Sequence, residues 1–160
     1  MVFVLLVTSH KTSPHPHEAG PHGNKNMSRR NINLSNDEYY HIYNRGNSKQ
    51  IIFLDDHDKY RFMKLLLVMN QENRKNLADI SKEEIFVKPI APLVAIDAYV
   101  IMDNHYHILL QQLQADGVTK FMQKVGTAYA SYFNKKYKRT GSLYDMRVGL
   151  RLNTLQLILI

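Results

Sequence analysis

Residues 94–111 read VAIDAYVIM-DN-HYHILLQ, two runs of β-favouring residues on either side of a short polar pair. The first run, 94–102, is apolar and rich in β-branched residues, and the second, 105–111, resumes after Asp103-Asn104. Strand-forming runs separated by two turn residues are typical of a β-hairpin. We therefore expect a hairpin here, and the rest of the chain is arranged around it.

The second run of the hairpin carries the most informative residues of the chain. Side chains alternate along a strand, so His105 and His107 are expected on one face and Tyr106, Ile108 and Leu110 on the packed face. Two imidazoles side by side can hold one divalent metal ion and leave positions open for substrate oxygens. The same pair is also compatible with surface or hydrogen-bonded histidines. A third ligand would have to come from elsewhere in the chain.

Outward from the hairpin, the pattern predicts further strands and helices. Residues 39–45 are aromatic and β-rich and predict a strand, and apolar spacings of three and four predict a helix over about 56–73. Residues 74–92 are polar and predict a loop. A second helix, with Asp116 as its cap, is predicted by an apolar stripe at Val118, Phe121, Met122, Val125, Tyr129, Tyr132 and Phe133. The order strand, helix, strand, strand, helix predicts an α+β fold, an antiparallel sheet with helices packed on one face.

The two ends of the chain differ from its middle. Residues 1–26 combine a short apolar start with scattered histidines and prolines, and we interpret them as a disordered leader before a domain over 27–147. Met27 is a candidate for the natural start. Residues 148–160 form an apolar tail with neither a helical nor a strand period. No segment has the length and composition expected of a membrane span or a signal peptide.

The charge of the chain is concentrated in one segment. The 160 residues include no cysteine, which excludes disulfides and thiolate metal sites, and the net charge is +7. Residues 119–151 hold eight lysines and arginines against Asp145 alone. A balanced body with one basic segment favours a polyanionic partner, although a solubilising helix face has the same composition.

Four ordered motifs, spread over roughly residues 38–147, resemble the single-tyrosine HUH transposases, and most of all the REP-associated tyrosine transposases. Residues 99–110 resemble their Met-Pro-Asn-His-x-His strand, with Asp103 in place of the usual proline. The segment YHIYNRG at 40–46 resembles their opening strand and turn. YFN at 132–134 and TGSL at 140–143, followed by Arg147, resemble their long helix and the turn after it.

The resemblance implies a ferredoxin-like α+β domain that cuts and rejoins single-stranded or hairpin-flanked DNA through a phosphotyrosine intermediate, in the prokaryotic cytoplasm. It also implies Mg²⁺ or Mn²⁺ held by His105 and His107. Single-stranded DNA needs a basic track and aromatic surfaces. The candidates for DNA contact are Asn44, Arg45, Lys120, Lys124, Lys135, Lys136, Lys138, Arg139 and Arg147.

The family's nucleophile lies in a C-terminal helix with a Tyr-Ile-x-x-Asn-Pro motif, and no such motif follows Arg147. We therefore expect that helix to be missing and the activity to be impaired. The possible substitutes are Tyr129, Tyr132 and Tyr144, of which the first two are also expected in the core. Two alternatives stay open: a non-catalytic DNA-binding module, and an unrelated metal-dependent hydrolase in which the histidine pair activates water.

Overall fold

The computed structural model of the chain describes residues 3–6, 34–72, 89–145 and 149–152, of which 3–6 and 149–152 are described by their backbone. The elements are β1 (Phe3–Leu6), β2 (Tyr39–Arg45), a short 3₁₀ turn η1 (Asn47–Lys49), α1 (Asp56–Val68), β3 (Val94–Met102), β4 (His105–Gln112), α2 (Gly117–Lys136) and β5 (Gly149–Leu152).

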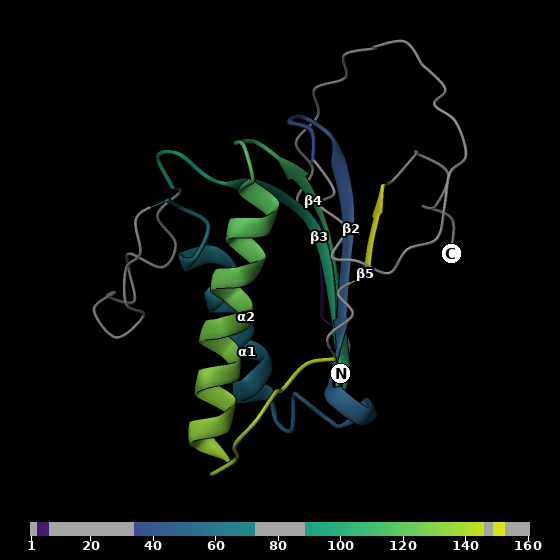
Figure 1. Cartoon of the computed structure of the whole chain (residues 1–160), viewed down its shortest axis with the longest axis vertical. Helices are drawn as coiled ribbons and strands as arrows, with labels where there is room; N and C mark the ends of the chain where they lie inside the picture. Colours follow the sequence, from purple (N-terminus) through teal and green to yellow (C-terminus); the bar gives the residue numbers. More distant parts are fainter. Residues whose placement is uncertain (1–2, 7–33, 73–88, 146–148, 153–160) are drawn as a thin grey trace.

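The strands form one antiparallel sheet in the order β1-β3-β4-β2-β5. Helices α1 and α2 both lie against the same face of this sheet (Figure 1). The predicted α+β class, with an antiparallel sheet and helices packed on one face, is therefore confirmed. The finer description of the fold as ferredoxin-like stays a prediction.

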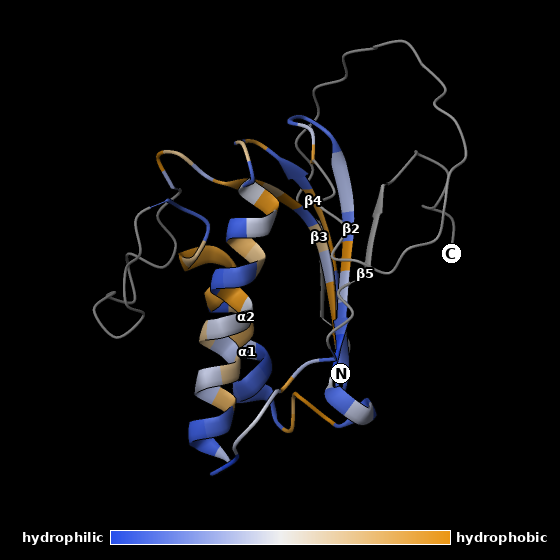
Figure 2. Ribbon diagram, viewed as in Figure 1, coloured by the Kyte–Doolittle hydropathy of each residue, from blue (hydrophilic) through white to orange (hydrophobic). Residues whose placement is uncertain are grey.

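The core lies between the helices and the sheet. Strands β2 and β4 bury every second residue, as expected for strands with one covered face. Apolar residues occur on both helices and along the central strands, whereas the C-terminal end of α2 is hydrophilic (Figure 2). The other face of β2, β3 and β4 has no helix over it among the described residues.

The predicted hairpin and the strand over 39–45 are confirmed, while both helices differ from prediction in detail. Helix α1 ends at Val68 rather than near residue 73. Asp116 stands at the start of α2 but its side chain makes no cap hydrogen bond, because its backbone is left-handed rather than extended. The side-chain oxygen of Gln112 instead accepts from the Val118 N–H at 3.2 Å.

Two segments outside the predicted domain of 27–147 contribute backbone at the edges of the sheet. Residues 3–6, within the segment interpreted as a leader, form β1 beside β3, and residues 149–152 of the predicted apolar tail form β5 beside β2. The rest of the leader and tail, Arg147 and most of the predicted 74–92 loop lie outside the described residues. Within the described ranges, no helix follows α2, and none is long and apolar enough to cross a bilayer.

Candidate functional site

The histidine pair lies on the face of β2, β3 and β4 that no described helix covers, which we call the open face. On β4, Tyr106, Ile108 and Leu110 are buried toward the helices, and His105 and His107 alternate with them and are half-buried on the opposite face. This is the placement that the alternation predicts. Among the described residues, no helix lies over the imidazoles on this side of the sheet.

The register of β2 against β4 brings further side chains to this pair. Tyr43 lies opposite His107, and Arg45 lies opposite His105. The centroids of the His41 and His107 rings are 5.0 Å apart and their planes differ by 13°, with His41 Nε2 and His107 Nδ1 2.9 Å apart in a hydrogen bond. The Tyr43 ring is 5.8 Å from that of His107 and is 36% exposed. The site is thus a row of aromatic rings with one guanidinium beside it.

His105 is positioned by the turn of the β3–β4 hairpin. The Asn104 side-chain oxygen lies 2.7 Å from His105 Nδ1, and the Asn104 amide nitrogen donates to the Lys49 carbonyl at 3.3 Å. The backbone carbonyl of Asn104 accepts from the Gly46 N–H at 2.9 Å. A Cβ on residue 46 would overlap the Gln50 carbonyl, so glycine is required for this close approach.

The electrostatics of the pair favour neutral imidazoles. Burial, together with the nearby Arg45 charge, lowers the pKa of His105. Burial, together with the neighbouring His41 and His105 rings, lowers the pKa of His107. Both shifts move the pKa below the ordinary histidine value of about 6.5 and so favour the neutral ring. The neutral ring is the form that binds metal ions.

The distance between the two rings is within the range expected for a shared metal ion. Metal–imidazole bonds of about 2.1 Å place the centroids of two rings that share an ion about 5 Å apart. The His105 and His107 centroids are 5.3 Å apart. Among the described residues no group of three His, Cys, Asp or Glu side chains forms a metal site. An ion held here by the two histidines would complete its coordination with water or substrate oxygens.

The predicted basic track lies on the other side of the sheet. Helix α2 carries Lys120, Lys124, Lys135 and Lys136, and it packs on the face opposite the histidines. Lys124 donates to the carbonyls of residues 71 and 72, at 2.6 and 2.8 Å. The predicted basic track and the predicted metal site therefore lie on opposite faces of the sheet. The charge pattern of the sequence does not show which face of the sheet a helix covers.

The other residues predicted to contact DNA are also not all on the histidine face of the sheet. Arg45 is exposed on the histidine face. Asn44 is 6% exposed and faces the helices, where its side-chain oxygen accepts from the Arg45 N–H, so it is not placed for DNA contact. Lys138 is exposed beyond the end of α2, and the Arg139 guanidinium lies 5.6 Å from the Phe133 ring centroid.

The three candidate tyrosines are all part of the packing on the helix side of the sheet. The buried Tyr129 hydroxyl donates to the Ile52 carbonyl at 2.6 Å, and the Tyr132 hydroxyl donates to Asp58 at 2.9 Å. The Tyr144 hydroxyl is buried without a hydrogen-bond partner among the described residues. Burial raises the pKa of all three, which disfavours the phenolate that would attack a phosphodiester.

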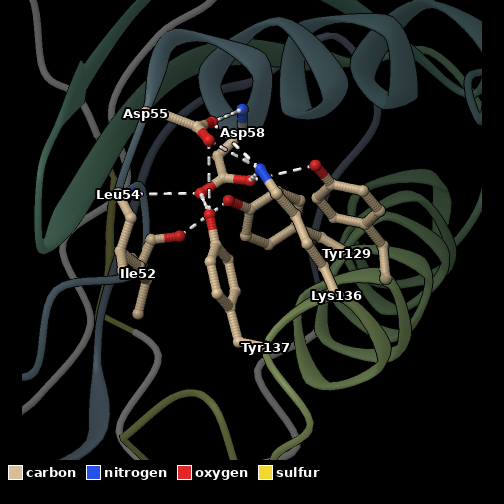
Figure 3. Close-up of polar contacts among 8 residues, drawn as sticks. Ile52, Leu54, Asp55, Asp58, Tyr129, Lys136 and Tyr137 are labelled. Carbon is tan, nitrogen blue, oxygen red and sulfur yellow. Dashed lines mark hydrogen bonds and ion pairs between the residues drawn. The ribbon is translucent and has the colours of Figure 1, made fainter.

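A second polar cluster, which the sequence did not predict, joins the start of α1 to the end of α2 (Figure 3). The fully buried carboxylate of Asp58 accepts from Lys136 Nζ at 2.7 Å and from the hydroxyls of Tyr132 and Tyr137. Lys136 also pairs with Asp55 at 2.8 Å. Lys136 is therefore committed to an ion-paired network rather than to a free basic surface.

Tyr43 and Asn104 are the site residues that sequence reasoning did not place beside the histidines. Tyr43 is two residues from His41, so strand alternation would have put both on one face. Which strand lies beside β4 depends on the sheet order, which one sequence does not give. No protein-family model and no curated protein matches this sequence.

Proposed function

We propose that this chain binds single-stranded or hairpin DNA on the open face of its sheet and holds Mg²⁺ or Mn²⁺ at His105 and His107, as an HUH transposase-like protein. The observation that carries the proposal is the pair of half-buried imidazoles side by side on a strand face that no helix among the described residues covers. The sequence motifs around that strand support the same assignment. The strand order β3-β4-β2-β5, with a helix after β2 and after β4, is the arrangement expected of a ferredoxin-like domain.

The residues of the open face have separate roles in this proposal. His105 and His107 supply the protein ligands, and an ion bound there would act as a Lewis acid on the scissile phosphodiester. The Arg45 guanidinium, opposite His105, attracts the phosphate charge. The exposed ring of Tyr43 offers a surface on which a base can stack.

Metal binding is the first test of this proposal. We expect the wild-type chain to bind Mn²⁺ in isothermal titration calorimetry and the His105→Ala/His107→Ala double variant to lose binding, because both imidazole ligands are removed. His57→Ala is the matched control, since His57 is an exposed histidine on α1, on the other side of the sheet. If the double variant binds Mn²⁺ as tightly as wild type, the site assignment is wrong.

The DNA surface can be tested separately at Tyr43. Loss of one base-stacking contact costs about 1–3 kcal/mol, which corresponds to roughly 5–150-fold in affinity. We therefore expect Tyr43→Ala to weaken the binding of a single-stranded oligonucleotide by that factor, measured by fluorescence anisotropy, whereas Tyr43→Phe keeps the ring and the affinity. Tyr60→Ala removes a comparably exposed ring from α1 and should have no effect. An unchanged affinity in Tyr43→Ala would exclude this face as the DNA surface.

The placement of the candidate tyrosines favours a second function, a DNA-binding module without covalent catalysis. Tyr129, Tyr132 and Tyr144 are held on the helix side, away from the histidines. Incubation with Mn²⁺ and a 3′-labelled hairpin oligonucleotide, followed by denaturing electrophoresis, separates the two functions, because a 5′-phosphotyrosine link would leave the 3′ fragment on the protein. A covalent protein–DNA adduct supports the transposase-like reaction, and metal-independent binding without an adduct supports the binding module.

A further inference from the structure

The hydrogen bond between His41 and His107 links the two central strands of the open face. His41 Nε2 and His107 Nδ1 are 2.9 Å apart, and the planes of the two rings differ by only 13°. A hydrogen bond between two ring nitrogens needs one N–H and one lone pair. The two rings therefore have two alternative proton arrangements, and these differ in which nitrogens of His107 carry hydrogen.

Only one arrangement leaves His107 able to bind a metal ion. If His41 Nε2 donates, a neutral His107 accepts at Nδ1 and carries its own hydrogen on Nε2, so it has no free lone pair. If His107 Nδ1 donates to His41 Nε2, the lone pair of His107 is on Nε2. A metal-bound histidine commonly donates its other ring N–H to an acceptor that fixes its tautomer.

The neighbouring histidine is held in the equivalent tautomer by a different residue. The Asn104 amide nitrogen donates to the Lys49 carbonyl. The Asn104 side-chain oxygen therefore faces His105 Nδ1, at 2.7 Å. An amide oxygen can only accept, so His105 Nδ1 carries the hydrogen and Nε2 has the lone pair. Both rings of the pair are then bonded at Nδ1, which leaves the same nitrogen, Nε2, for a shared ion.

We propose that His41 is a positioning residue that accepts the hydrogen bond from His107 Nδ1 and so presents His107 Nε2 as a metal-ligating nitrogen. This inference rests on the proposed metal site at His105 and His107. His41 acts through His107 and contacts no reacting atom. The alternative is that His41 is itself a metal ligand, since nitrogens 2.9 Å apart could also share an ion.

Two variants of the full chain test the proposal. His41→Leu removes the acceptor, and His41→Gln restores one through its amide oxygen. We expect His41→Leu to weaken Mn²⁺ binding in calorimetry by about 10–100-fold, the usual effect of losing such a partner. His41→Gln should bind Mn²⁺ close to wild type, and His57→Leu, on α1, should match wild type. Circular dichroism checks that all variants keep the fold.

A second measurement determines the tautomer of His107 in the metal-free protein. Nitrogen-15 NMR of the imidazole rings should show His107 protonated at Nδ1 in wild type and His41→Gln, and not predominantly so in His41→Leu. Unchanged Mn²⁺ affinity in His41→Leu, or His107 protonated at Nε2 in the metal-free wild type, would overturn the positioning role.

The remaining outcomes separate this inference from the proposed function. If His41→Leu and His41→Gln both lose Mn²⁺ as completely as His107→Ala, His41 is a ligand and the positioning role is wrong, while the metal site stands. If wild type itself binds no Mn²⁺, the proposed metal site fails and the positioning role fails with it.

Discussion

Replacing Asp58 with alanine is expected to lower the free energy of unfolding by about 3–5 kcal/mol, because a fully buried carboxylate that accepts several hydrogen bonds is lost. Domains of this size have a total stability of about 5–15 kcal/mol, so the variant would be close to unfolding at ambient temperature. The expected loss comes from the number of donors that converge on one carboxylate rather than from the ion pair alone.

Four donors from two segments reach the Asp58 carboxylate (Figure 3). One oxygen accepts from Lys136 Nζ at 2.7 Å and from the Tyr132 hydroxyl at 2.9 Å. The other accepts from the Tyr137 hydroxyl at 2.8 Å and from the Leu54 N–H at 2.9 Å. The side chain is fully buried, so alanine would remove the shared acceptor of the Tyr132 and Tyr137 hydroxyls and the Leu54 N–H, while Lys136 would keep its ion pair with Asp55.

The neighbouring Asp56 provides a matched control for this prediction. Asp56 lies in the same first turn of α1 but is exposed. Asp56→Ala should cost about 0.3–1 kcal/mol, because it loses only its interaction with the helix dipole. Urea unfolding followed by circular dichroism measures both variants. If Asp58→Ala loses no more stability than Asp56→Ala, the cluster does not hold the two helices together.

The local sequence pattern predicted the helices and strands, whereas tertiary contacts determine where they end. The spacing of apolar residues predicts a helix to about residue 73, yet α1 ends at Val68. The Asn70 side chain leaves the helix to pair with the backbone of Val94, donating to its carbonyl at 2.8 Å and accepting from its N–H at 3.0 Å. Such a contact joins residues 24 apart and has no periodic signature in the sequence.

Strand alternation predicted the histidine pair of the candidate site but not the residues beside it. Alternation placed His105 and His107 together because they are on one strand. The partners of that pair depend on register: Tyr43 and Arg45 lie opposite the histidines only because β2 pairs with β4. The basic residues of α2 were grouped with the site by charge, which carries no information about which face of the sheet a helix covers.

The second large effect is expected at Phe62, in the centre of the core. Phe62 is fully buried on α1, and its ring lies 4.7 Å from Tyr106, 5.3 Å from Phe53 and 5.2 Å from Tyr129. Truncating such a ring removes apolar burial and leaves a cavity, so Phe62→Ala should cost about 3–5 kcal/mol in urea unfolding. Phe62→Leu keeps most of the volume and should cost less than about 1.5 kcal/mol.

Tyr60 on the same helix is the control, because its ring is 49% exposed and Tyr60→Ala should stay within about 0.5 kcal/mol of wild type. An equally small loss in Phe62→Ala would show that the packing around Tyr106 is not the centre of the core.

Phe62 also tests how the core is connected to the histidine face, because its partner Tyr106 lies between His105 and His107 on β4. The position of β4 is fixed mainly by its backbone pairing with β2 and β3, which Phe62→Ala leaves in place. A ligand that binds only the folded state stabilises it by an amount set by its concentration and Kd. Saturating Mn²⁺ should therefore raise the stability of Phe62→Ala and wild type by the same increment. A smaller increment in Phe62→Ala would mean that core packing, and not the strand ladder alone, sets the spacing of the two imidazoles.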